Sequence, residues 1–288
     1  MPPVTFRAHP ITGDPIVFAP ERASRPGAFG GNDTDRCPFC PGHESDTPPT
    51  IATVGDPWRV RVFRNKYPSV DDAEVIVESA QHDATFDRVA HAQDVVRTYV
   101  DRYRAHASAA HVALFKNEGP GAGTSIPHIH SQVMPLPFVP PRVEREGEAF
   151  ASATRCPLCE ALDAHRIRET SSFAWLAPAA SWMPYQQWIV PKRHIAEMSA
   201  FDDHEVAELA TLLQSASRAM LTLGHSYNWI FMNFARRATA HCYVELFPRI
   251  TAFGGFELGT GTFVEIVDPA IAAQRLKAAG DASVGSSQ

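Results

Sequence analysis

The sequence has no long hydrophobic run and no cluster of basic residues. No apolar stretch approaches the roughly 20 residues that cross a bilayer. The N-terminus lacks a charged segment followed by an apolar one, so we expect a cytoplasmic protein with no membrane association. The formal net charge of −6 argues against binding to a nucleic-acid polymer, although small phosphorylated ligands need only local positive charge.

The composition also excludes a disordered chain. Hydrophobic residues make up 44% of the sequence and charged residues 20%, which is typical of a soluble globular protein. With 288 residues, the chain is long enough for two domains of ordinary size.

Cysteine is scarce, and its placement is informative. Four of the five cysteines form two Cys-Pro-x-Cys pairs, Cys37 with Cys40 and Cys156 with Cys159. In a reducing compartment, such pairs indicate metal binding before disulfide formation. We expect the remaining Cys242 to pack in the core.

A glycine-rich loop followed by a His-x-His-x-Gln strand lies between residues 117 and 135. Alternate side chains of a strand share one face, so His128, His130 and Gln132 should project together. The glycines before them allow backbone amides to approach an anion. This combination suits phosphorus chemistry, in which one imidazole attacks and one amide donates to a phosphoryl oxygen. A buried strand with two incidental histidines is the alternative interpretation.

Hydrophobic periodicity predicts the surrounding elements. Alternation indicates strands, and spacings of three and four residues indicate helices. The expected strands lie at residues 58–64, 73–78, 111–117, 188–190 and 227–233, and the expected helices at about 87–106, 142–148 and 203–223.

The second half of the chain repeats the plan of the first. His-x-His-x-Gln-x-x-Pro begins at His128, and His-x-Tyr-x-Glu-x-x-Pro begins at His241, each after a Phe-x-Asn strand and a helix. This indicates an internal duplication, with a catalytic domain at residues 1–150 and a degenerate copy at residues 151–288. Only the first copy keeps the second histidine and the glycine loop, so the chemistry should lie there.

The duplication predicts two structural metal sites. Each combines one Cys-x-x-Cys turn with two histidines, which is the four-ligand pattern of structural zinc. The two predicted ligand sets are Cys37, Cys40, His82 and His128, and Cys156, Cys159, His194 and His241. One or two zinc ions per chain are expected, and each site can supply on the order of 10 kcal/mol of folding free energy.

With these motifs, the sequence resembles the galactose-1-phosphate uridylyltransferase family of the histidine triad superfamily, and comparably the sister enzyme ADP-glucose phosphorylase. The likeness runs from His-Pro-Ile-Thr-Gly at residue 9, through Cys-Pro-Phe-Cys and Ser-Ile-Pro-His-Ile-His-Ser-Gln, to Gly-Phe-Glu-Leu-Gly-Thr-Gly at residues 255–261. It implies an α+β fold of two tandem histidine-triad domains, with antiparallel sheets and packed helices forming a half-barrel. It also implies a homodimer with sites at the subunit interface.

The resemblance implies a ping-pong nucleotidyl transfer. His130 would attack the α-phosphorus of an NDP-sugar, and Gln132 would hydrogen-bond the transferred group. Because a glutamine cannot act as an acid, its presence favours transfer over hydrolysis. The resemblance further implies contacts to phosphate, nucleoside or sugar from Ser125, Asn117, Gly123, Phe63, Asn65, Arg22, Arg25 and Glu257.

Two departures leave the base and the acceptor open. Lys66 and Phe263 stand where the uridylyltransferase pattern has an acidic residue and a glutamine. The glycine-rich run near residue 257 and the zinc-type second half favour the phosphorylase. The hypotheses are therefore a uridylyltransferase of galactose metabolism with a hexose 1-phosphate acceptor, an NDP-sugar phosphorylase that uses phosphate, or a nucleotide-binding module without turnover. The intact His130 and Gln132 argue against the third.

Overall fold

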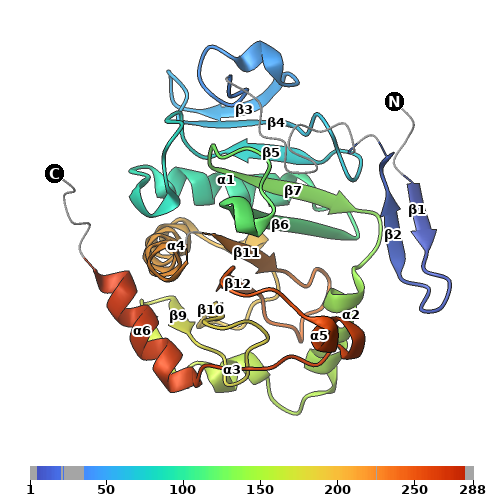
Figure 1. Ribbon diagram of the computed structural model, residues 1–288, viewed down its shortest axis with the longest axis vertical. Helices are drawn as coiled ribbons and strands as arrows, with labels where there is room; N and C mark the ends of the chain where they lie inside the picture. The colour runs from blue at the N-terminus through green and yellow to red at the C-terminus, as the bar shows by residue number, and fades with distance from the viewer. Residues whose placement is uncertain (1–4, 21, 23–35, 225, 283–288) are drawn as a thin grey trace.

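A single antiparallel sheet of ten strands forms the centre of the molecule (Figure 1). The computed structural model describes residues 5–20, 22, 36–224 and 226–282. In spatial order the strands are β3 (Thr50–Val54), β4 (Val60–Arg64), β5 (Glu74–Val77), β7 (His130–Leu136), β6 (His111–Glu118), β11 (Tyr227–Met232), β12 (Tyr243–Pro248), β10 (Gln187–Pro191), β9 (Phe173–Leu176) and β8 (Arg166–Glu169).

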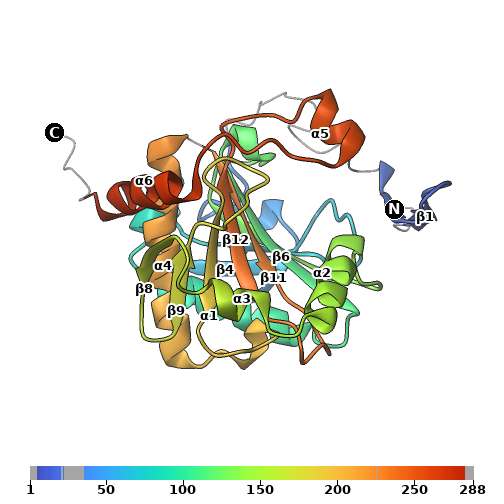
Figure 2. The ribbon, with the colours of Figure 1, turned by 90° about the horizontal axis from the view of Figure 1, so that it is seen from below.

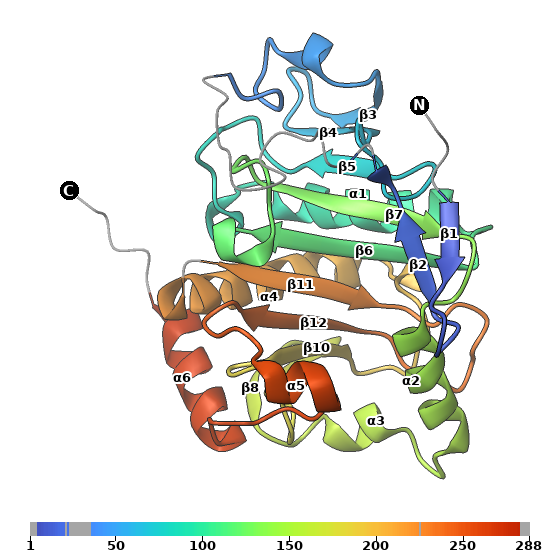
Figure 3. The same cartoon turned by 45° about the vertical axis from the view of Figure 1, so that its right-hand side comes forward.

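The order of the strands reflects the duplication. Five strands from the first half of the chain meet five from the second half where β6 pairs with β11 (Figure 3). The sheet is open, since β3 and β8 lie at its opposite edges, which agrees with the predicted half-barrel. The division into two domains stays a prediction, and the boundary expected at residue 150 falls within helix α2 (Pro141–Ser152).

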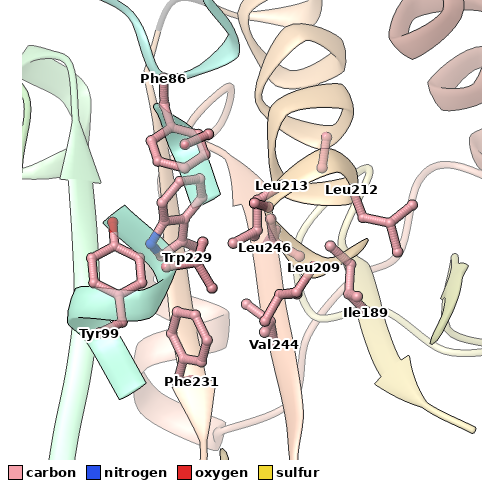
Figure 4. Packing of buried hydrophobic residues seen from close by; sticks show 14 of the residues in the cluster. Phe86, Tyr99, Ile189, Leu209, Leu212, Leu213, Trp229, Phe231, Val244 and Leu246 are labelled. Atoms are coloured by element: carbon pink, nitrogen blue, oxygen red, sulfur yellow. The ribbon is translucent and has the colours of Figure 1, made fainter. Parts of the chain in front are cut away.

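Helices α1 (Ala92–Ala105) and α4 (Asp203–Leu223) cover one face of the sheet, and α6 (Pro269–Asp281) packs beside α4 (Figure 2). Leu209 and Leu213 of α4 point toward Val244 and Leu246 of β12, and all four side chains are buried (Figure 4). The predicted helix at residues 203–223 is confirmed. The first helix begins at Ala92, later than expected, because residues 86–88 form a separate 3-10 turn.

The opposite face carries α2, α3 (Pro157–Ala161) and the Cys-Pro-Phe-Cys turn. Val143 and Phe150 of α2 pack with Val190 of β10 and Tyr243 of β12. The short helix α5 (Gly255–Thr260) lies near this face, and the hairpin of β1 (Thr5–Ala8) and β2 (Pro15–Phe18) stands apart from the main sheet (Figures 1 and 3). Among the described helices, none is both long enough and apolar enough to cross a membrane.

An ion pair fixes β5 to the helix layer. Arg102 of α1 donates two hydrogen bonds of 2.7 Å to Glu74, and His106 lies 3.0 Å from the same carboxylate. Burial raises the pKa of Glu74, but the hydrogen bonds from His106 and Arg102 outweigh it, and the net result is a lowered pKa. This stabilisation is present above the unfolded carboxyl pKa of about 4.3 and is lost as the pH falls through the lower folded value.

We therefore expect Glu74→Gln to lower the free energy of unfolding by about 2 kcal/mol at neutral pH. The difference in free energy of unfolding between the variant and wild type should become smaller as the pH falls below about 4, since protonation of Glu74 in wild type removes the same charge. Urea denaturation followed by circular dichroism, repeated at several pH values, measures the free energy of unfolding and its pH dependence. The exposed ion pair partner Asp163 offers the control Asp163→Asn, and an equal loss in both variants would contradict the argument.

Candidate active site and metal centres

His130 is buried at the start of β7 and is held in one tautomer. Its Nδ1 lies 2.9 Å from the carbonyl oxygen of His128. A carbonyl oxygen only accepts, so Nδ1 carries the proton and Nε2 keeps a free lone pair. Burial lowers the pKa of His130 to about 4, so the imidazole is neutral at pH 7. The geometry is that of an imidazole nucleophile whose second nitrogen is oriented by an acceptor.

A cavity of about 250 Å³ opens beside this imidazole. It brings together residues from the glycine loop, from β4 and the segment after it, and from β7. Among the predicted catalytic and substrate-binding residues, those that line it are Phe63, Asn65, Gly123, Ser125, His130 and Gln132. The predicted nucleophile and amide donor therefore share one cavity with the predicted nucleoside pocket.

The wall of the cavity includes residues that sequence reasoning missed. Phe39 lies with its ring centroid 5.2 Å from that of His130 and 5.5 Å from that of Phe63. Phe39 lies between Cys37 and Cys40. In the sequence this position indicates metal binding by its neighbours, and it does not indicate that Phe39 lines a pocket. Arg36 also lines the cavity, and so does Lys66, which the sequence marks as a departure from the uridylyltransferase pattern. Both add positive charge, which is partly offset by Asp46, 2.9 Å from Arg36.

The glycine loop is shaped by two local requirements. Gly123 has a φ of +85°, a left-handed conformation that favours glycine. Gly121 approaches Ser226 of the second half, where an added Cβ would lie 3.3 Å from the serine side chain. The backbone N–H of Gly121 donates to Ser226 Oγ at 3.1 Å, so the second half of the chain holds the loop in place.

Asn117 faces a neighbouring cavity instead. Its side-chain oxygen accepts a hydrogen bond of 2.8 Å from Asn228 of β11. Together with Arg249, these residues line a space of about 530 Å³ that shares Gly123 with the first cavity. Asn117 therefore lies on β6, one strand away from His130 on β7.

Two further predicted contacts, Arg22 and Glu257, do not line either cavity. Arg22 donates a hydrogen bond of 2.7 Å to the carbonyl oxygen of Tyr67, which lines the first cavity. Glu257 accepts from the backbone N–H of Gly254 at 2.9 Å and caps its own helix. Arg25 lies outside the described residues.

The first predicted metal site is assembled. The ligand atoms of Cys37, Cys40, His82 and His128 all lie within 4.8 Å of one another. His128 Nδ1 is 3.6 Å from each thiol sulfur, and its Nε2 lies 2.7 Å from the carbonyl oxygen of Ser79. That carbonyl can only accept, so the lone pair of Nδ1 faces the thiols. Two thiols and two imidazoles so arranged fit a tetrahedral zinc ion.

The second site repeats this geometry. Cys156, Cys159, His194 and His241 also place their ligand atoms within 4.8 Å of one another. His241 Nδ1 lies 3.5 Å from both sulfurs, while its Nε2 is 2.9 Å from the carbonyl oxygen of Pro191. The two halves therefore present the same donor set in the same orientation.

The second copy has no counterpart of His130. Tyr243 takes the place of His130, and burial raises its pKa well above the usual value. Its hydroxyl donates to Glu146 at 2.9 Å, while Glu245, in the place of Gln132, binds Arg142 at 2.8 Å. A cavity of about 330 Å³ remains there, but its polar groups largely satisfy one another.

The two sites predict about two zinc ions per chain in elemental analysis of the purified protein. Cys37→Ser should remove one zinc ion and lower the thermal stability, because the ligands hold the turn against β7. Its main effect should therefore be on folding and not on the chemical step. Cys242, buried outside both sites, offers the control Cys242→Ala, which should keep both ions. Metal-free protein with four freely titratable cysteines would refute the assignment.

Comparisons with known proteins find relatives over most of the chain. A family model described as the N-terminal domain of a domain of unknown function (DUF4931) matches residues 24–139. The chain is 29% identical to ADP-glucose phosphorylase of Arabidopsis thaliana, over 92% of this chain and 90% of that protein. It is 25% identical to galactose-1-phosphate uridylyltransferase of Thermotoga maritima, over 94% of this chain and 97% of that protein.

A solved structure of a uridylyltransferase superposes with a TM-score of 0.82 at 25% identity, covering 96% of this chain and 98% of that one. This agreement extends over both halves of the sheet, and the named relatives are enzymes of the nucleotidyltransferase kind. The chain is therefore a relative of the galactose-1-phosphate uridylyltransferases, with a comparable likeness to ADP-glucose phosphorylase.

Proposed function

We propose that this protein transfers a nucleoside monophosphate from an NDP-sugar to a phosphate-bearing acceptor through a covalent nucleotidyl-His130 intermediate. The observation that carries the proposal is the tautomer of His130, since the hydrogen bond from Nδ1 to His128 leaves the lone pair of Nε2 available and His130 lines the cavity. Gln132 and Ser125, which line the same cavity, are the proposed partners of the transferred phosphoryl group.

The reaction balances without a general acid. Nε2 of His130 bonds to the α-phosphorus, and the bond from phosphorus to the sugar 1-phosphate oxygen breaks, that oxygen keeping the electron pair. The imidazole retains its proton on Nδ1 and carries a positive charge in the intermediate. An oxygen of the acceptor phosphate then attacks the same phosphorus, and the released imidazole is neutral again. Gln132 need only donate a hydrogen bond, which suits an amide.

The cavity suits a nucleotide. Phe39, Phe63 and Val75 are buried apolar side chains that can contact the flat base, while Asn65 offers an amide for specificity. The glycine loop from Gly119 to Gly123 supports phosphate binding, as backbone amides at such turns bind anions. Arg22, Arg25 and Asn117 stay proposed contacts to the nucleotide or its phosphates.

Zinc would act structurally here. Both ligand sets are complete with four protein donors, so a bound ion would cross-link the turns to the core strands and leave no position for substrate. In the first half, the cross-linked turn carries Pro38 and Phe39 into the cavity wall. The metal ligands therefore support the site by holding this wall.

The acceptor is proposed to be a hexose 1-phosphate, with inorganic phosphate as the alternative. The Thermotoga relative is named for galactose 1-phosphate, and the Arabidopsis relative is named an ADP-glucose phosphorylase. Incubating the protein with UDP-glucose, ADP-glucose or a GDP-sugar, each with phosphate or with a hexose 1-phosphate, and identifying the products separates the two. Formation of a new NDP-sugar supports the first acceptor, and formation of NDP supports the second.

We also propose that the active form is a cytoplasmic homodimer. The segment after β12 exposes large apolar side chains, with Phe256, Leu258 and Ile266 showing 55%, 75% and 71% of their surface. A second copy would cover them, and it would give Glu257, which lies outside both cavities of its own chain, a route to a partner's sugar site.

The intermediate gives the sharpest prediction. An NDP-sugar added without acceptor should release one sugar 1-phosphate per active site and leave the nucleotide on the protein as an acid-labile, base-stable phosphoramidate. His130→Gly should abolish this labelling and keep both zinc ions, because His128 and not His130 faces the thiols. Gln132→Ala should label on the order of a hundredfold more slowly.

Labelled nucleotide on another residue, or steady hydrolysis to the nucleoside monophosphate as the main reaction, would contradict this mechanism. Quenched-flow labelling with a substrate radiolabelled on its α-phosphate, followed by peptide mapping, distinguishes these outcomes. His204→Ala is a matched control, since His204 is an exposed histidine at the start of α4.

The second copy predicts a negative result. Tyr243 donates to Glu146 in a separate cavity and its phenol is protonated at pH 7, so it cannot replace a neutral imidazole as a nucleophile. Tyr243→Phe should therefore keep measurable transfer activity. Complete loss of activity in a well-folded Tyr243→Phe protein would mean that the second copy takes part in catalysis.

A further inference from the structure

A buried charged network lies on the face of the sheet opposite the cavity. The carboxylate of Glu78, just after β5, accepts hydrogen bonds from Lys116 Nζ at 2.6 Å, from Tyr99 OH at 2.5 Å and from Ser131 Oγ. Lys116 also lies 2.9 Å from Glu118. Lys116 and Glu78 are fully buried, and the network ties together β5, β6, β7 and helix α1.

The second half of the chain folds in the same way without these groups. In the first half, Ser131 of β7 pairs with Lys116 of β6. At the corresponding place, one residue after Tyr243, Val244 of β12 pairs with Phe231 of β11. Both replacements are apolar and buried, and Phe231 lies among the core side chains of Figure 4.

The central carboxylate is also missing from the second copy. Ile76 pairs with Ser131, and Ile189 pairs with Val244, so the register places Pro191 where the first half has Glu78. Taking charges out of water is costly, and well-packed apolar side chains often replace a buried ion pair without loss of stability. The fold therefore does not require the network, which is present only in the half that carries His130.

Glu78 holds both neighbours of His130 in the chain. Its backbone N–H donates to the carbonyl oxygen of Ile129 at 3.2 Å, and its carboxylate accepts from the hydroxyl of Ser131. Ser131 itself is 2.9 Å from the hydroxyl of Tyr99. The backbone on either side of the nucleophile is therefore anchored to one residue.

We propose that Glu78, with Tyr99, Ser131 and Lys116, forms a positioning network that holds His130 Nε2 in line with the α-phosphorus. This inference rests on the proposed function. A displacement of about 1 Å at a reacting atom can reduce a rate on the order of a hundredfold, so rigid support from the far side of the sheet has a kinetic consequence. None of the four side chains lines the cavity beside His130, so they act through His130 and not on the substrate.

Tyr99→Phe and Ser131→Ala test the network with the smallest changes. Each should slow single-turnover labelling about tenfold or more, while zinc content and the dissociation constant for the nucleoside monophosphate stay as in wild type. Ser131→Thr, which restores the hydroxyl, should recover most of the rate. Lys116→Met alone would leave Glu78 and Glu118 without their cation, so the charged groups are tested together by the triple variant Glu78→Gln/Lys116→Met/Glu118→Gln, which should fold and label slowly.

The control comes from the same helix. Tyr103 is buried one turn after Tyr99, and its hydroxyl donates to Glu197 at 3.1 Å, outside the network. Tyr103→Phe should label at the wild-type rate.

If Tyr99→Phe, Ser131→Ala and the triple variant all label as fast as Tyr103→Phe, the network serves stability only and the inference is overturned. If any of them loses its zinc or its affinity for the nucleoside monophosphate together with its rate, the role is structural and the inference is equally overturned. Wild-type protein that is not labelled by any NDP-sugar would instead refute the proposed function, so the two failures are distinguishable.

Discussion

The geometry of the site depends on His128. Its Nδ1 faces the two thiols of the first cysteine pair, its Nε2 is bound to the carbonyl oxygen of Ser79, and its own carbonyl oxygen accepts from His130. A metal ion bound by this ligand set would fix the position of His128. The carbonyl oxygen of His128 in turn fixes the tautomer of His130. Because the turn between the cysteines also carries Phe39 against His130, the proposed metal ligands and the proposed nucleophile belong to one packed cluster.

Local rules account for most of what the sequence predicted. The two-residue period of a strand placed His130 and Gln132 on one face, and the repeat paired each cysteine turn with its histidines. What failed depended on contacts between distant segments. Phe39 could be placed in the cavity wall only by knowing that the cysteine turn packs against Phe63 of β4. The late start of α1 follows a 3-10 turn in which the ring centroid of Phe86 lies 4.7 Å from that of Trp229, a contact with the second half of the chain.

The residues assigned by resemblance alone divide into two groups. Four of them line the cavity beside His130, namely Phe63, Asn65, Gly123 and Ser125, while Asn117 and Glu257 do not. Asn117 lies on β6, where the side chain of Asn228 binds it at the seam between the halves, so its cavity belongs to both copies. Glu257 caps a helix whose neighbouring side chains Phe256 and Leu258 are exposed. A motif identifies a residue type at a position in the sequence. What its side chain faces depends on the contacts between the two halves of the chain and on any second chain.

The duplication serves as an internal comparison within one molecule. Both copies keep the strand order and the ligand geometry, so those features belong to the fold. The copies differ on both faces of the same strand: His130 and Ser131 in β7 correspond to Tyr243 and Val244 in β12. Stability alone gives no reason for this coupling, since paired charges are costly to bury where apolar packing suffices. A buried charged network confined to the copy with His130 is explained if rigid placement of this proposed nucleophile limits the rate.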